Sequence, residues 1–202
     1  MVLLKKILRK VNKIISMVIR RGKIIDGVVA LEKLGLDPTI AHEHADTNDY
    51  LELYRILSKI GSSNKVIVDL GCGSGAAIAL FEWLHYEVIY GVELSEILAN
   101  RATENFKKNK VVKIFNIDAR DFNEEVDIIF MFNPFPLGIL IEVLENLQKN
   151  KKELTVIYRN PKYFKNIESI FNVSNVRIID STVSSYAIFQ IGATCQKHYY
   201  LT

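Results

Sequence analysis

From residue 65 onward, short apolar runs alternate with segments whose apolar residues recur at helical spacing. The run Ile128–Phe132 is apolar without interruption, which is typical of a central parallel strand covered on both faces. Strands are expected at 66–70, 88–93, 111–117, 126–132 and 154–158, and helices at 76–86, from 95 to the lysines at 107–110, at 137–149 and at 162–171.

Two further strand-like runs, 176–180 and 186–191, are separated by only five residues. That connection is too short for a helical crossover, so these two strands are expected to be antiparallel. Five strand–helix units followed by a hairpin predict an α/β fold: a Rossmann-like, doubly wound sheet of seven strands, mostly parallel, with an antiparallel C-terminal hairpin strand.

The N-terminal part lacks this alternation and predicts helices instead. Residues 3–21 place apolar side chains at helical spacing, with Lys and Arg mostly on the other side. After it, a short helix, a loop and a longer helix are expected at 27–36, 37–46 and 47–60. The chain is therefore divided into an N-terminal helical extension, residues 1–46, and a main domain, residues 47–202.

Composition fits a folded domain: the chain has 202 residues, of which 49% are hydrophobic and 24% charged. No stretch of about 18 uncharged apolar residues occurs, so a membrane-spanning helix is not expected. The two cysteines, Cys72 and Cys195, lie far apart and imply neither a disulfide framework nor a metal site. A reducing, cytoplasmic setting is therefore expected.

The net charge of +3 is spread unevenly, because residues 1–23 contain eight Lys or Arg and no Asp or Glu. This basic helix has three interpretations. It can pack on the domain as a lid or a dimer contact, which is the favoured one. It can lie on an anionic membrane, which would make the protein peripheral on the inner membrane face. It can also contact nucleic-acid phosphates, which is the least favoured of the three. The oligomeric state stays open.

Candidate chemistry lies at the carboxyl ends of the predicted strands, where open α/β sheets bind ligands. The first strand runs into the loop Asp69-Leu70-Gly71-Cys72-Gly73-Ser74-Gly75, whose glycines allow close approach of a ligand, and the following helix N-terminus offers free N–H groups. Glu93 ends the second strand, 22 residues after Gly71, where an acid can accept hydrogen bonds from ribose hydroxyls. Because a nicotinamide enzyme would use the same pattern, these residues indicate a nucleoside ligand without choosing one.

Three further features help to choose between these nucleoside ligands. Asp69 stands just before the first glycine, where it could hold a ligand amino group. Asp118 and Ala119 follow the third strand, where an acid can reach an adenine amino group or simply cap a helix. The fourth strand ends in Asn133-Pro134-Phe135-Pro136, which puts a polar group and an aromatic ring at the crevice.

With these motifs the chain resembles the class I S-adenosylmethionine-dependent methyltransferases over residues 50–191. Motif-like segments stand at 66–75, 90–95, 116–121 and 132–135. The resemblance implies that the loop Asp69–Gly75 holds the methionine end of the cofactor, that Glu93 binds the ribose and Leu94 packs on the adenine, and that Asp118 and Ala119 contact the adenine edge. Residues 47–202 would then form the cofactor-binding domain.

The fourth motif is similar to small bacterial or archaeal members with Phe-Asn-Pro-Phe at this strand end. It departs from the Asn/Asp-Pro-Pro-Tyr/Phe element of amino-methylating members, because Phe135 precedes Pro136. Asn133 is expected to position the substrate, with Pro134, Phe135 and Tyr50 in the substrate site. Other candidates near the mouth are His42, His44, Asp46, Tyr158 and Arg159.

The predicted function is in-line methyl transfer from S-adenosylmethionine to an unidentified acceptor: a small molecule, a glycan or lipid precursor, or a macromolecular side group. The alternatives are an NAD-dependent oxidoreductase and a non-catalytic S-adenosylmethionine-binding protein. The segment His42-Glu43-His44 with Asp46 is interpreted as a solvated loop, since no third ligand is placed by spacing, so no metal is expected.

Overall fold

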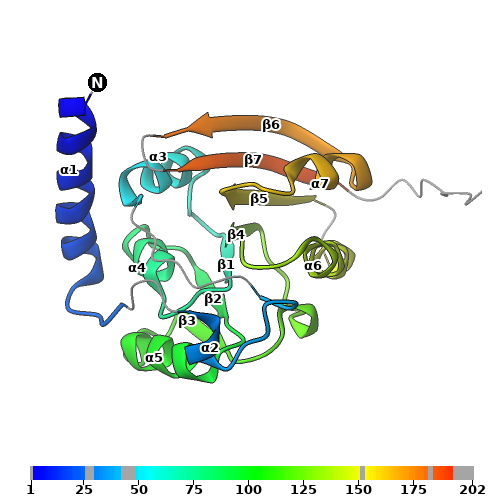
Figure 1. Ribbon diagram of the computed structural model, residues 1–202, viewed down its shortest axis with the longest axis horizontal. Coiled ribbons are helices and arrows are strands. Elements are labelled where there is room, and N and C mark those ends of the chain that lie inside the picture. Colours follow the sequence, from blue (N-terminus) through cyan, green and yellow to red (C-terminus); the bar gives the residue numbers. More distant parts are fainter. Residues whose placement is uncertain (1, 26–29, 42–48, 151–152, 182–183, 193–202) are drawn as a thin grey trace, which may run out of the picture.

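A single mixed sheet forms the centre of the molecule in the computed structural model, which describes residues 2–25, 30–41, 49–150, 153–181 and 184–192. Its strand order is β3-β2-β1-β4-β5-β7-β6 (Figure 1). The strands are β1 Val66–Leu70, β2 Val88–Val92, β3 Val112–Phe115, β4 Ile128–Phe132, β5 Glu153–Arg159, β6 Val173–Asp180 and β7 Ser185–Gly192. Strands β1 to β5 run parallel, and β7 is antiparallel to both β5 and β6. The predicted seven-stranded, doubly wound fold with its C-terminal hairpin is confirmed.

Helices cover both faces of the sheet. One apolar cluster joins one face to α3 Tyr50–Ile60, α4 Ala76–Trp83 and α5 Glu96–Phe106. A second joins the other face to α6 Leu137–Asn150 and α7 Phe164–Ile170. The central strands are buried along nearly their whole length, as their uninterrupted apolar runs predict.

The connection between β3 and β4 differs from the predicted strand–helix unit. Its residues 116–127, all of them described, contain the 3-10 turn η1, Ala119–Asp121, and no α-helix. The helix expected at 27–36 is reduced to α2, Leu31–Leu34, which ends where Gly35 turns left-handed at φ 66°. Residues 26–29 lie outside the described part of the chain.

Helix α1, Val2–Arg20, packs at one edge of the molecule against α3 and α4 (Figure 1). Within the described ranges, no helix is long and apolar enough to cross a membrane.

The topology fixes where a ligand can bind. β1 and β4 are neighbours, yet the chain leaves β1 into α4 on one face of the sheet and leaves β4 into α6 on the other. The two connections diverge and open a crevice at the carboxyl ends of these strands.

Candidate functional site

The glycine loop after β1 is tied to the end of β2. The backbone N–H groups of Gly71 and Cys72 both donate to the carbonyl of Val92, at 2.9 and 3.0 Å. Gly71 has φ 74°, and a Cβ there would lie 2.6 Å from Cβ of Pro134. Only glycine allows this backbone and this approach. The loop is therefore packed directly under the residue that follows Asn133.

Glu93 is buried and fastens the same loop. Its two carboxylate oxygens accept hydrogen bonds from the backbone N–H of Gly73 (2.8 Å) and of Ser95 (2.9 Å). The side chain of Asn116 donates to the carbonyl oxygen of Glu93 at 2.9 Å and so holds this strand end. Each carboxylate oxygen can accept more than one hydrogen bond. The fixed carboxylate therefore suits a ligand diol such as a ribose.

Asp69 presents the most unusual electrostatic environment of the loop. Its side chain is only 4% exposed, and no described residue donates a hydrogen bond to its carboxylate. Burial, and secondarily the neighbouring charge of Glu93, raise the pKa of Asp69 well above its usual range. A buried carboxylate without a donor favours a cationic ligand group, which would compensate its charge.

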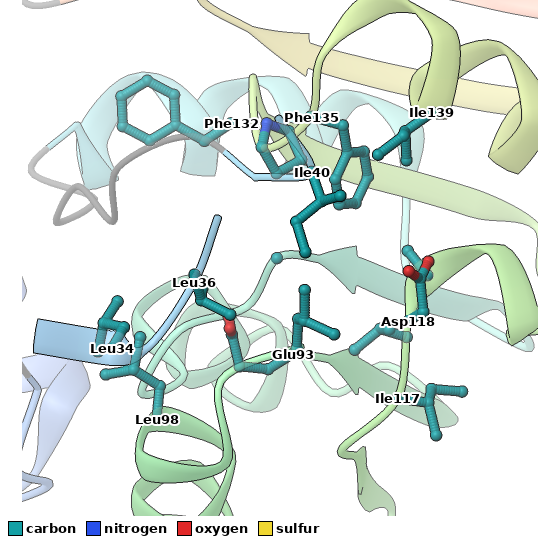
Figure 2. Close-up of a pocket in the computed structure, with 15 residues that line it drawn as sticks. Leu34, Leu36, Ile40, Glu93, Leu98, Ile117, Asp118, Phe132, Phe135 and Ile139 are labelled. Atoms are coloured by element: carbon teal, nitrogen blue, oxygen red, sulfur yellow. The ribbon is translucent and has the colours of Figure 1, made fainter. Parts of the chain in front are cut away.

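Asp118 caps η1 and also lines the pocket. Its carboxylate accepts from the backbone N–H of Arg120 (2.9 Å), and the guanidinium of the same arginine lies 2.7 Å from the second carboxylate oxygen. The hydrogen bond from the Arg120 side chain lowers the pKa of Asp118. Asp118 is therefore a cap, as one of its two predicted interpretations has it, and its side chain also lines the pocket (Figure 2). The predicted contact with adenine stays a prediction.

The end of β4 holds Asn133 in a constrained position. Asn133 has φ 44°, in the left-handed region that asparagine tolerates better than other side chains. The hydroxyl of Tyr158, on neighbouring β5, donates to Oδ1 of Asn133 at 2.6 Å. Burial raises the pKa of Tyr158, so the phenol stays protonated and acts as a donor. The β4–β5 pairing thus fixes the Asn133 amide.

The pocket gathers residues from four strand ends and from the N-terminal segment. Its described lining is Gly71, Val92, Glu93, Leu94, Leu98, Ile117, Asp118, Ala119, Phe132, Pro134, Phe135 and Ile139, together with Leu34, Leu36 and Ile40. Figure 2 shows Leu34 and Leu36 near Leu98 and Glu93, and Ile40 near Phe135. These three were missed as site residues. Leu34 and Leu36 fall in the helix predicted at 27–36 and Ile40 in the loop predicted at 37–46, so their apolar character was the available signal.

Some predicted site residues lie elsewhere. Tyr50, predicted as a substrate contact, does not line the described pocket. It is fully buried at the start of α3, where its hydroxyl donates to the carbonyl of Ala76 at 2.8 Å. Leu70, Cys72 and Ser74 are buried within or beneath the loop, and burial raises the pKa of the Cys72 thiol.

Arg159 is buried beside the pocket wall. Its guanidinium stacks on the ring of Phe132 at 4.1 Å and donates from Nε to Ser184. The candidates His42, His44 and Asp46 lie outside the described residues. Within the described ranges, no three His, Cys, Asp or Glu side chains gather as a metal site would require.

The family model of ribosomal protein L11 methyltransferase (PrmA) matches residues 32–157, which is more than half of the chain. The chain belongs to the PrmA methyltransferase family. The match starts within the N-terminal segment and so includes the pocket residues Leu34, Leu36 and Ile40. Membership confirms the predicted class, the class I methyltransferases, and its cofactor, S-adenosylmethionine. The nicotinamide alternative is not favoured.

A curated relative agrees with the PrmA family. Ribosomal protein L11 methyltransferase of Aquifex aeolicus is 24% identical over 138 residues, which cover 66% of this chain and 55% of that protein. The chain thus spans about half the length of this relative.

Solved structures of low identity show the same fold. Ribosomal protein L11 methylase from Lactobacillus delbrueckii has a TM-score of 0.58 at 16% identity, covering 78% of this chain and 84% of its own. Magnesium protoporphyrin IX methyltransferase from Synechocystis, solved with bound S-adenosylmethionine, has a TM-score of 0.54 at 14% identity, covering 72% of this chain and 78% of its own.

Proposed function

We propose that this chain transfers the methyl group of S-adenosylmethionine to an amine nitrogen of a protein. The buried carboxylate of Asp69 beside the glycine loop, to which no described residue donates a hydrogen bond, carries the cofactor side of the proposal. That carboxylate would hold the cofactor's ammonium group, while Glu93 would take the ribose hydroxyls. Leu94, Asp118 and Ala119 would contact the adenine. Gly71 has no side chain and so leaves open the space beside the cofactor that a Cβ would fill.

The protein's part in the reaction is chiefly alignment. Bound S-adenosylmethionine supplies a methyl group on a sulfonium, an excellent leaving group. The strand ends of β1, β2 and β4 hold the two reactants in one crevice, and such positioning can supply a large share of a rate enhancement. Phe135 and Pro134, on the acceptor side, would narrow the approach and exclude water.

The pocket's polar groups favour a neutral amine over a hydroxyl as acceptor. A hydroxyl acceptor needs a general base. The ionisable side chains lining the described pocket are Glu93 and Asp118, and both are assigned here to the ribose and adenine of the cofactor. An amide oxygen can accept a second hydrogen bond, so Oδ1 of Asn133 could orient an amine N–H. This would direct the nitrogen lone pair toward the methyl group.

Protein acceptors are favoured because the matched relatives are ribosomal protein L11 methyltransferases. The first acceptor to test is therefore ribosomal protein L11 of the same cell. The full chain is incubated with this protein and methyl-labelled S-adenosylmethionine, and mass spectrometry locates any label. We expect label on amines, lost in Asn133→Ala while S-adenosylhomocysteine still binds.

The outcomes separate the two halves of the proposal. Calorimetric binding of NAD and not of S-adenosylhomocysteine would overturn the cofactor assignment. Cofactor binding with label appearing only on RNA would leave the cofactor site standing and overturn the protein acceptor.

A further inference from the structure

Helix α1 is attached to the body through both polar and apolar groups. Asn12 is 5% exposed and its Oδ1 accepts the backbone N–H of Leu51, which is one of the unpaired donors at the start of α3. Arg20 donates to the hydroxyl of Tyr50 at 3.2 Å. Ser16 is also buried, at 8% exposure, while Ile15 and Ile19 pack against the apolar cluster of α3 and α4. The inward face of the helix thus combines hydrogen-bonding and apolar side chains.

The opposite side of α1 is apolar and faces outward. Ile7, Val11, Ile14 and Val18 recur at intervals of four, three and four residues, which places them on one stripe of the helix. Their exposed fractions are 49%, 37%, 62% and 53%, and Met17 beside the stripe is 68% exposed. We call these five residues the outer stripe. A contiguous apolar stripe on a surface helix marks a binding surface more often than a scattered exposed residue does.

Charge identifies what this surface fits. The outer stripe lies among the eight Lys or Arg of residues 1–23, a segment with no acid. Lys10 and Lys13 are exposed beside it. A second copy of the same helix would bring like charges together, which opposes self-association. Nucleic-acid phosphates would match the lysines but leave the apolar side chains without a partner. An apolar stripe bordered by cations fits an anionic lipid surface.

We propose that the outer stripe of α1 lies in the interface of an anionic membrane, with the helix parallel to the bilayer plane. Isoleucine, valine and methionine side chains insert between acyl chains, while Lys10 and Lys13 meet lipid headgroups. Because Asn12 and Arg20 on the inward face stay hydrogen-bonded to α3, the helix can dock on the membrane without leaving the body. The surface is separate from the methyl-transfer site, since the described pocket lining contains no α1 residue.

The test is co-sedimentation of the full chain with vesicles. We expect binding to vesicles of phosphatidylcholine mixed with phosphatidylglycerol, little binding to phosphatidylcholine alone, and weaker binding at higher salt. Ile14→Glu/Val18→Glu should lower binding at least about tenfold through loss of the apolar contact. Lys10→Glu/Lys13→Glu should lower it by at least about the same factor through loss of headgroup attraction.

Matched controls come from the other side of the molecule. Ile178→Glu changes an isoleucine that is 53% exposed on β6. Lys149→Glu/Lys165→Glu changes two exposed lysines of α6 and α7, which lie opposite α1 in Figure 1. We expect these variants to sediment as the parent does. Unchanged S-adenosylhomocysteine binding in every variant checks that the fold is intact.

Three results would overturn the proposal. The first is a parent chain that ignores anionic vesicles, which would leave an acidic protein partner as the occupant of the outer stripe. The second is an equal loss in the control variants, which would mean that only overall charge matters. The third is a dimer by light scattering that Ile14→Glu/Val18→Glu dissociates.

Discussion

Replacing Asp69 by Asn should stabilise the protein without bound cofactor and should weaken its binding of the cofactor. The pKa of Asp69 is raised by burial, so between the pKa of the unfolded chain and that of the folded one the native state holds the extra proton. Stability contributed by this group is therefore complete at low pH and is lost as pH rises toward the folded pKa. Each pH unit in that interval costs about 1.4 kcal/mol. Asn does not titrate and avoids this loss.

The stability arm is measured by thermal unfolding of parent and variant across pH. A loss of about 1.4 kcal/mol corresponds to roughly 3–6 °C in Tm for a chain of this size. In acid we expect the parent and the Asn variant to have the same Tm. Near about pH 8 we expect the Asn variant to have the higher Tm. Glu93 is present in both proteins, so a difference between them reports on residue 69.

The binding arm uses calorimetry with S-adenosylhomocysteine, which carries the same ammonium group. Removing one partner of a buried, hydrogen-bonded charge pair costs about 2–5 kcal/mol, or about thirtyfold to several thousandfold in Kd. Parent binding should release a proton at pH values below the pKa of Asp69, and variant binding should not. A variant that binds like the parent, or whose empty form is less stable at high pH, would refute the role assigned to this carboxylate.

Three further changes test neighbouring parts of the site. Gly71→Ala should weaken S-adenosylhomocysteine binding at least about tenfold by calorimetry and destabilise the chain by about 1–3 kcal/mol, since its Cβ would meet a proline ring at 2.6 Å. The control is Gly138→Ala, in open space on α6, which should neither weaken binding nor destabilise the chain. Tyr158→Phe removes the hydroxyl that orients Asn133, so acceptor turnover should fall about tenfold or more while cofactor affinity stays constant; equal losses in both would contradict a positioning role. Ile40→Ala should speed release of S-adenosylhomocysteine in stopped-flow measurements by thinning the apolar wall of the pocket, and an unchanged rate would mean that this wall does not retain the ligand.

The glycine loop and the position of Glu93 could be predicted because the loop requires glycines and the strand before Glu93 requires a short apolar run. A left-handed φ and a close approach demand glycine, and a strand end before a loop demands a short apolar run. Asp69 was predicted from its place in the motif, but its lack of donors is a property of packing. The hydrogen bond between Tyr158 and Asn133 depends on which strands are neighbours, and sequence order does not reveal that.

The N-terminal segment shows where amphipathicity misleads. Helical spacing located α1 correctly, and the usual expectation is that the apolar side packs inward. In the structure Asn12 and Ser16 face the body together with Ile15 and Ile19, while the outer stripe stays exposed. The apolar residues Leu34, Leu36 and Ile40 escaped notice for the opposite reason. They line the pocket from a four-residue helix and the segment after it, which are too short for a periodic pattern to reveal the face they turn to the pocket.

The carboxylate of Glu93 combines a structural role with a proposed binding role. It latches the glycine loop through Gly73, and it is the proposed partner of the ribose. A substitution that admits a cofactor analogue altered on its sugar would therefore also release the loop that holds the other end of the molecule. Altered cofactor preference at this site thus demands a compensating change in the loop, so single-residue routes to a new sugar specificity should be closed.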